Sequence, residues 1–311
     1  MTRKLIIDCD PGIDDALALC LALFDPRLEV LAITPCAGTV DPEQATENVH
    51  NLVERIDPPR MPRIGVAVSP ERGAAVFNQS QLHGERGLGN VHWPPVSRQH
   101  SITSDKLIVD QVRANPGQVT IVCTGPLTGL AKALQRDPAI AGMLDQIIIC
   151  GGSVSGVGDV TPCAEFNMHF DPASSRSVFH SATTKSLIPL EISRCLNFGW
   201  ELVDQLPDRF TSVGAVLHDL IPYLLRTTRQ QLGHESVSFQ AILPILMLLD
   251  SSVMKFEGMA GDVEVTGELT LGATVFDRRD PRSWRDNMEV ACHIDVDKAL
   301  EVFHQSLSAC G

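Results

Sequence analysis

The sequence has few basic residues. Lys and Arg together number 25, against 38 Asp and Glu, and the formal net charge at pH 7 is −13. Proteins that bind the phosphate backbone of nucleic acids need clustered Lys and Arg side chains. The charge balance therefore argues against a nucleic-acid polymer as partner and favours small molecules and cations.

A long apolar run near the N-terminus is also missing. The first apolar segment begins at Leu5 and ends before Asp8. It is too short for the core of a signal peptide or for a membrane span. The sequence therefore predicts a cytoplasmic protein with no membrane partner.

No Cys-x-x-Cys pair suggests a zinc site. The nine cysteines are an odd number, and most lie in apolar runs, as do Cys20, Cys123, Cys150 and Cys292. This pattern is typical of reduced core residues and not of a disulfide framework. Cys163 lies in a glycine-rich loop and is the candidate for an exposed cysteine.

No low-complexity tract, internal repeat or linker divides the 311 residues, of which 44% are hydrophobic. We therefore expect one domain over residues 1–311. Apolar runs that predict strands alternate with helical patterns; the strands are expected at 4–7, 28–34, 64–68, 119–123, 146–150 and 187–190, then near 263, 274 and 290. Residues 201–249 read as mainly helical, punctuated at Pro207, Pro222 and Gly233. The alternation predicts an α/β fold, with a mainly parallel twisted sheet covered by helices on both faces.

Four carboxylates lie within eight positions, between the first predicted strand and an apolar run that predicts a helix. They are Asp8, Asp10, Asp14 and Asp15. No Lys or Arg occurs between Lys4 and Arg27 to offset their repulsion, so a hard divalent cation such as Ca²⁺ or Mg²⁺ is the natural partner. The alternative is that the first two end a strand and the last two cap a helix.

Other polar turns follow predicted strands. Ligands of open α/β sheets bind beyond the carboxyl ends of the strands, so Thr39, Thr124 and the Gly151-Gly152 turn should converge with the acidic loop. The irregular stretch 69–103 is long enough to be functional. Its centre, 82–90, contains three glycines and His83, and it is either a flap over the acids or a mobile surface loop.

These residues together resemble the inosine-uridine type nucleoside hydrolase family. The resemblance spans nearly the whole chain and rests on motifs at 8–15, 37–38, 83–89, 124–128, 151–152, 164–167, 171–172 and 266–272. The first motif, Asp-x-Asp-Pro-Gly-x-Asp-Asp, is unbroken here and is the most specific. The resemblance implies a Rossmann-like α/β domain, a homodimer or homotetramer, and cleavage of the N-glycosidic bond of ribonucleosides with bound Ca²⁺.

The resemblance also implies roles for individual residues. Asp10 is expected to contact the metal and to take a proton from the attacking water, while Asp15 and the carbonyl of Thr124 ligate the metal. Four further residues are expected to contact the ribose: Asp14, Thr39, Glu165 and Asn167. His83 and Gln240 are expected on the side of the flap and the base.

Three positions depart from the family pattern. Counting back from Asp250 places Ala241 where the family has its last metal-binding Asp, and Gln240 where many purine-active members have a His; Thr39 replaces an Asn. Fewer charged ligands should weaken Ca²⁺ binding, and loss of the His removes a leaving-group acid. The sequence therefore predicts slow or specialised catalysis. His234 or Glu235 is a substitute if that loop folds inward; a solvated face is the favoured reading.

Two further hypotheses stay open. The first is a nucleoside- or ribose-binding relative that has lost turnover. The second is an aspartate-based phosphohydrolase that uses Asp8 and Asp10, although the Lys and late acidic pair of that chemistry are not evident. Base preference does not follow from the sequence.

Overall fold

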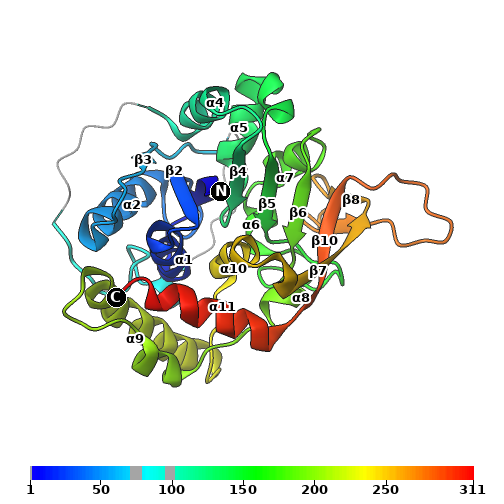
Figure 1. The fold of residues 1–311 in the computed structure, drawn as a ribbon. Helices are drawn as coiled ribbons and strands as arrows, with labels where there is room; N and C mark the ends of the chain where they lie inside the picture. Colours follow the sequence, from blue (N-terminus) through cyan, green and yellow to red (C-terminus); the bar gives the residue numbers. More distant parts are fainter. Residues whose placement is uncertain (1, 71–78, 95–101) are drawn as a thin grey trace.

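Eight strands form a central sheet in the order β3, β2, β1, β4, β5, β6, β10, β7, with helices on both faces (Figure 1). The structure is a computed structural model that describes residues 2–70, 79–94 and 102–311. The strands of the sheet are β1 (Arg3–Cys9), β2 (Leu28–Pro35), β3 (Arg63–Ile64), β4 (Val119–Cys123), β5 (Gln146–Cys150), β6 (Lys185–Ile188), β7 (Met254–Met259) and β10 (Met288–Ile294). Strand β7 runs antiparallel to β10, and the other neighbours are parallel. The predicted fold class is confirmed.

The helices start where the sequence provides caps. The side chains of Asp41, Asp171 and Asp295 each accept a hydrogen bond from a backbone N–H in the first turn of the helix that follows. The longer helices are α1 (Ile13–Phe24), α2 (Pro42–Ile56), α4 (Ser104–Ala114), α5 (Thr128–Arg136), α7 (Pro172–Phe179), α9 (Ser212–Leu232), α10 (Leu243–Leu249) and α11 (Val296–Ser308). The short ones are α3 (Ser80–His83), α6 (Phe166–Phe170), α8 (Leu190–Ser193), and the 3₁₀ turns η1 (Pro138–Gly142), η2 (Trp200–Gln205), η3 (Gln240–Ile242) and η4 (Ser251–Val253). A separate antiparallel pair is formed by β8 (Gly261–Val263) and β9 (Thr274–Phe276).

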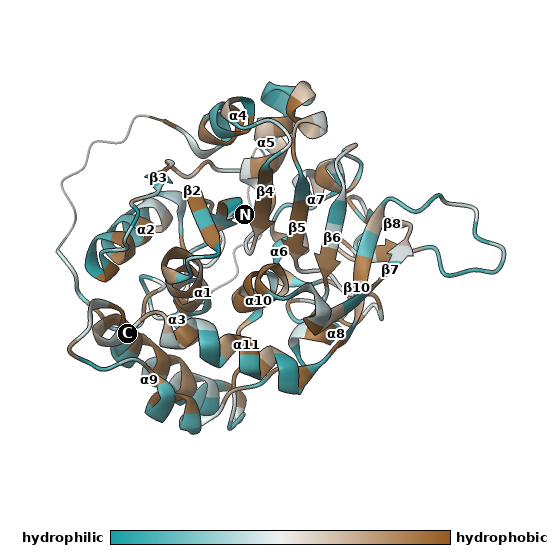
Figure 2. Cartoon of the chain, viewed as in Figure 1, coloured by the Kyte–Doolittle hydropathy of each residue, from teal (hydrophilic) through white to brown (hydrophobic). Residues whose placement is uncertain are grey.

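The sheet separates two hydrophobic cores. Leu5 and Ile7 of β1 pack into the core shared with α1, α9 and α10, whereas Ile6 packs into the core shared with α4, α5 and α7. Side chains alternate along a strand, so a strand buried on both faces must be apolar throughout. Figure 2 shows this as brown along β4 and β5 and over α1 and α10, with paler and teal colour on the outer helices.

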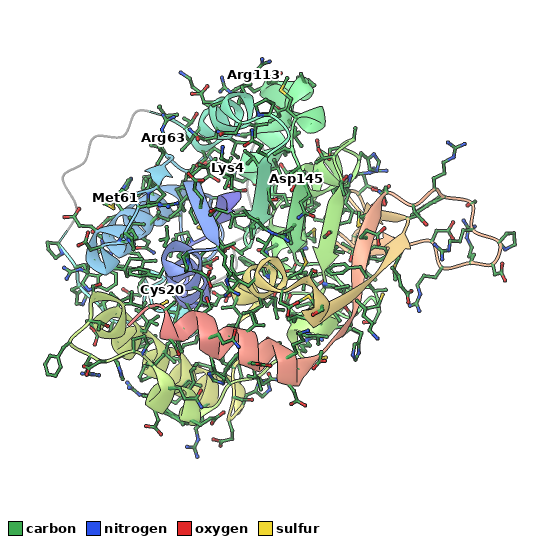
Figure 3. All side chains as sticks on the ribbon, viewed as in Figure 1. Lys4, Cys20, Met61, Arg63, Arg113 and Asp145 are labelled. Atoms are coloured by element: carbon green, nitrogen blue, oxygen red, sulfur yellow. The ribbon has the colours of Figure 1, made fainter. Side chains whose placement is uncertain are left out.

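The chain order reverses between β1 and β4. The chain passes from β1 to β2 and β3, then returns to place β4 on the other side of β1. Such a switch point leaves a crevice at the carboxyl ends of the two strands. Asp10 follows β1 and Thr124 follows β4, so both lie at this crevice. Lys4 and Asp145 lie at the opposite, amino-terminal edge (Figure 3).

The predicted helix break at Pro222 is wrong, because Pro222 lies inside α9. A proline in a helix leaves the carbonyl four residues earlier without its N–H donor. Here that carbonyl belongs to His218, and Arg209 Nη2 lies 3.5 Å from its oxygen. The helix therefore continues through the proline.

Cys292 is exposed, so its prediction as a core residue is wrong. The pairing of β10 with β7 shifts register between Ala291 and His293, and such an irregularity turns a side chain away from its regular face. The other three cysteines predicted in the core are buried, and all nine are free.

Two predicted strands also differ in their bounds. The strand expected at 64–68 is reduced to Arg63–Ile64, followed by single bridges, and that expected at 187–190 begins two residues earlier, at Lys185. Parts of the predicted 69–103 loop, residues 71–78 and 95–101, lie outside the described residues. No helix in the described part of the chain is both long and apolar enough to cross a membrane.

Candidate active site

A cavity of about 460 Å³ opens at the carboxyl ends of the central strands. All nine residues that the sequence predicts for the site line this one cavity: Asp10, Asp14, Asp15, Thr39, His83, Thr124, Glu165, Asn167 and Gln240. They come from segments up to 230 positions apart, and the order of the strands brings them together. A second cavity, of about 560 Å³, lies beside Lys185 and contains none of them.

The Asp10 carboxyl is held between two glycine turns. Its Oδ2 accepts hydrogen bonds from the backbone N–H of Thr39 at 2.8 Å and from the Thr39 hydroxyl at 2.9 Å. A Cβ atom at either Gly38 or Gly125 would clash with this carboxyl. The glycines therefore let the turns after β2 and β4 close on Asp10, which is 4% exposed.

Asp15 links the start of α1 to the turn after β4. Its Oδ1 accepts from the Thr124 hydroxyl at 2.6 Å, and its Oδ2 accepts from the backbone N–H of Gly12 at 3.2 Å. Asn167 lies next to them, since its Nδ2 donates to the Thr124 carbonyl at 2.9 Å and to the Cys150 carbonyl at 3.1 Å. The turns that follow β1, β4 and β5 are thus connected by side chains of the site.

The electrostatics of the acidic loop are unfavourable without a counter-charge. Burial, followed by repulsion from Asp15 and Asp14, raises the pKa of Asp10 well above its usual value. Burial and repulsion from Asp14 raise the pKa of Asp15 to about 7. A cation or protons are therefore needed to hold these carboxyls together.

The donors suit a hard cation in kind, although they are few. Asp10, Asp15 and the Thr124 carbonyl offer the oxygen ligands that Ca²⁺ and Mg²⁺ prefer. In the described part of the chain, no group of three or more His, Cys, Asp or Glu side chains is placed to hold a metal ion. Ala241, which is 1% exposed, occupies the position where the family resemblance predicts a further metal-binding Asp.

Glu165 is a buried carboxyl on the other wall. Its Oε2 accepts hydrogen bonds from the backbone N–H of Gly152 at 2.9 Å and from that of Met168 at 3.2 Å. Burial, and then repulsion from Asp159, raises the pKa of Glu165 to about 8. Glu165 is therefore protonated at neutral pH unless a ligand places positive charge nearby.

Glu165→Gln is expected to flatten the dependence of folding stability on pH. Between about pH 4.5 and 8 the folded protein binds a proton at Glu165 that the unfolded chain releases, so stability falls as pH rises through this range. The contribution lost between pH 6 and pH 9 is roughly 3 kcal/mol, because about two pH units of that range lie below the raised pKa. Urea unfolding of both proteins at pH 6 and pH 9, in the presence of a chelator, measures it.

Glu268→Gln is the matched control, because Glu268 is exposed. It should leave the pH dependence of the parent unchanged. An unchanged slope in Glu165→Gln would contradict the assignment of a raised pKa to Glu165.

His83 packs on the start of α1. Its Nδ1 accepts a hydrogen bond from the backbone N–H of Ile13 at 3.1 Å, so the ring proton is on Nε2. Burial lowers the pKa of His83, which favours the neutral ring. The segment from 82 to 90 is anchored further where the Thr227 hydroxyl of α9 donates to the Leu82 carbonyl at 2.8 Å. These contacts favour the flap interpretation over that of a mobile surface loop.

Sequence reasoning missed several residues of the cavity. Asp159 and Arg194 stand at its exposed rim, and Leu224, Thr228 and Leu232 come from one face of α9. The α9 residues are spaced by four, which places them on one side of the helix. The sequence signal for this wall was Thr228, a polar residue within an otherwise apolar stripe. For Asp159 and Arg194 no local signal distinguishes them from ordinary loop residues.

Of the two residues predicted as possible substitutes in the loop after α9, only His234 lines the cavity. His234 lines the cavity at its exposed rim, whereas Glu235 forms an exposed ion pair of 3.2 Å with Arg229 and does not line the cavity. Gln240 lines the cavity, and its carbonyl accepts from the Cys150 thiol at 3.2 Å.

Comparisons with known proteins agree with this geometry. Residues 5–301 match the family model described as inosine-uridine preferring nucleoside hydrolase. The chain is 31% identical to the inosine-uridine preferring nucleoside hydrolase of Leishmania major, over 96% of this chain and 95% of that protein. It is 32% identical to uridine nucleosidase 1 of Arabidopsis thaliana, over 96% of this chain and 91% of that protein. Among solved structures, the purine-preferring ribonucleoside hydrolase from Gardnerella vaginalis matches with a TM-score of 0.90 and 26% identity, over 99% of both chains.

Proposed function

Because the chain belongs to the family of inosine-uridine preferring nucleoside hydrolases, we propose that it hydrolyses the N-glycosidic bond of ribonucleosides to ribose and free base. One observation carries the proposal: the nine residues expected from the sequence line a single cavity. Its volume, about 460 Å³, lies in the usual range for small-molecule sites.

In the proposed reaction, Asp10 takes a proton from the attacking water. Cleavage builds positive charge on the sugar, so the carboxyls of Asp14 and Glu165 and the amide oxygen of Asn167 stabilise it. Thr39 orients Asp10 through its two hydrogen bonds. We propose Ca²⁺ as the ion that Asp10, Asp15 and the Thr124 carbonyl would hold; when bound, it supplies a Lewis acid that orients water and ribose hydroxyls.

The proposed enzyme has a reduced set of acidic groups. Ala241 offers no oxygen ligand, and Gln240 offers at most a neutral amide. Ion affinity depends on ligand charge and number, so we expect weak Ca²⁺ binding and modest turnover. The same departures keep the alternative of a ribose-binding relative without turnover testable.

The phosphohydrolase alternative gains little support. It requires Asp8 as a nucleophile, yet Asp8 is 0% exposed and does not line the cavity. Its Oδ1 accepts from the Thr34 hydroxyl at 2.7 Å, and burial raises its pKa to about 7. A buried, protonated carboxyl is a poor nucleophile.

Two measurements on the full chain test the proposal. A reducing-sugar assay on inosine, uridine and adenosine should detect released ribose, and isothermal titration should detect Ca²⁺ binding. Ribose bound tightly with no sugar released from any nucleoside would contradict hydrolysis and support the binding relative. Phosphate released from a general phosphomonoester, and abolished by Asp8→Asn, would instead support the phosphohydrolase.

A further inference from the structure

The loop after α9 turns one of its faces to the cavity. Four alternate residues of this loop line it: His234, Ser236, Ser238 and Gln240. Glu235 and Phe239 between them do not. Val237 also lines the cavity, and its backbone exchanges two hydrogen bonds, of 2.8 and 2.9 Å, with that of Phe198. Successive side chains of an extended chain point to opposite sides, so the alternation places the imidazole of His234 on the cavity face.

The residues on either side of His234 fix its direction. Gly233 ends α9 in the left-handed region, with φ at +70°, and its N–H donates to the Arg229 carbonyl at 3.1 Å. Glu235 forms its ion pair with the side chain of the same Arg229, at 3.2 Å, and so lies back along the helix. His234, between these two anchors, is left at the exposed rim of the cavity.

This wall faces the base of a bound nucleoside, given the proposed hydrolysis on which the inference rests. The proposed reaction assigns the ribose to the side of Asp14, Glu165 and Asn167. Much of the remaining lining comes from three residues of α9 and from the loop that follows it. A nucleoside held by its ribose at the acids therefore turns its base towards the wall that carries His234.

The leaving base creates a demand for a proton. When the bond between C1′ and the base nitrogen breaks, the bonding pair goes to the base. A neutral base then departs as an anion unless an acid protonates it, and such acid catalysis is typically worth 10²–10⁴ in rate. Gln240 cannot meet this demand, because an amide is not an acid at neutral pH.

Two other residues of the lining carry a proton, but neither suits the role. His83 accepts the Ile13 N–H at Nδ1, and burial lowers its pKa, so its ring is neutral and a weak acid. Burial raises the pKa of Glu165 to about 8, yet this carboxyl lies on the side of the sugar. Two residues on, Asn167 donates to the Thr124 carbonyl, a proposed ion ligand, at 2.9 Å.

We propose that His234 is the acid that protonates the leaving base. The water oxygen bonds to C1′, and one water proton goes to Asp10. The bonding pair of the C1′–N bond goes to the base, which takes a proton from the His234 imidazolium. Exposure at the rim lets the imidazole regain a proton from solvent while Asp10 releases one, so the two transfers balance over a turnover.

His234→Gln tests the assignment with leaving groups of two kinds. The p-nitrophenolate ion is a stable anion, so p-nitrophenyl β-D-ribofuranoside needs no acid for its cleavage, whereas inosine and uridine do. The variant should lower kcat/KM about 10²-fold for whichever of the two nucleosides the parent cleaves. It should change kcat/KM for the nitrophenyl riboside less than twofold, which also shows that the fold and the sugar site are intact.

His293→Gln is the matched control, because His293 is exposed on β10 and does not line the cavity; it should affect none of the three substrates. Equal losses for all substrates in His234→Gln would mean that His234 only shapes the cavity, and no loss for any would place the acid elsewhere. Either result overturns this inference and leaves the proposed hydrolysis standing. A parent that cleaves the nitrophenyl riboside but neither nucleoside has no working acid, which also overturns it. Cleavage of none of the three would overturn both.

Discussion

Asp10→Asn is expected to lower kcat for ribose release by about 10³-fold or more. Removal of a general base typically costs 10²–10⁴ in rate, and this residue is also a proposed ion ligand. The amide that replaces the carboxyl keeps an oxygen for the two hydrogen bonds from Thr39 but cannot take a proton from water. A reducing-sugar assay at saturating nucleoside measures the loss.

The same variant should be at least as stable as the parent in the absence of metal. Asp10 is buried beside Asp15, and the pKa of Asp10 is raised because burial and this neighbour disfavour its ionised form. A neutral amide removes that repulsion. Urea unfolding with a chelator present should therefore show an unchanged or increased free energy of unfolding, which separates lost chemistry from lost structure.

Asp41→Asn makes the same chemical change at an exposed helix cap. The Asp41 side chain accepts from the Gln44 N–H at 2.8 Å, and asparagine caps helices about as well as aspartate. This control should retain full activity. If Asp10→Asn also released ribose at the rate of the parent, Asp10 would not be the base.

The acidic loop was predictable because its determinants are local. The run before Asp8 is apolar at every position, as a strand buried on both faces requires, and Pro11-Gly12 marks the turn. Once the sheet is parallel, the carboxyl ends of its strands share an edge, so the convergence of Thr39 and Thr124 follows from strand order, whereas Glu165 was expected from the family resemblance. That edge is where the structure places them.

The far wall was less accessible to sequence reasoning. Leu224 and Thr228 belong to a helix whose apolar stripe could pack anywhere on the sheet, and only tertiary contacts turn one part of it towards the cavity. Pro222 misled for a related reason. A local rule predicts interruption, but Arg209, thirteen residues earlier, lies next to the carbonyl that the proline leaves without a donor.

Ala241→Asp is expected to tighten Ca²⁺ binding by at least about tenfold, because affinity rises with the number and charge of oxygen ligands. Ala241 follows Gln240, which lines the cavity, and both lie in η3, which packs against the helix that carries Asp14 and Asp15. A carboxylate there would add a third acidic group to the pair at Asp10 and Asp15. Isothermal titration of parent and variant with Ca²⁺ measures the change.

The variant should also make folding depend on Ca²⁺. An unpaired buried carboxylate near two others costs roughly 3–5 kcal/mol, so without the ion Ala241→Asp should unfold at lower urea than the parent. Binding to the folded state alone restores about 2.7 kcal/mol when free Ca²⁺ is a hundred times its Kd. At the same excess of Ca²⁺, the free energies of unfolding measured with chelator and with Ca²⁺ should thus differ by about 1.4 kcal/mol more in the variant than in the parent, the equivalent of a tenfold tighter Kd.

Ala241→Asn separates charge from size at this position. The amide has nearly the same shape as the new carboxylate but adds no negative charge, so it should bind Ca²⁺ no more than slightly better than the parent. If Asp and Asn variants bound the ion equally, position 241 would lie away from it, and the weak ion binding expected of this chain would need another cause. If only the Asp variant gains affinity and also releases ribose faster from uridine, the missing carboxylate is what limits the parent.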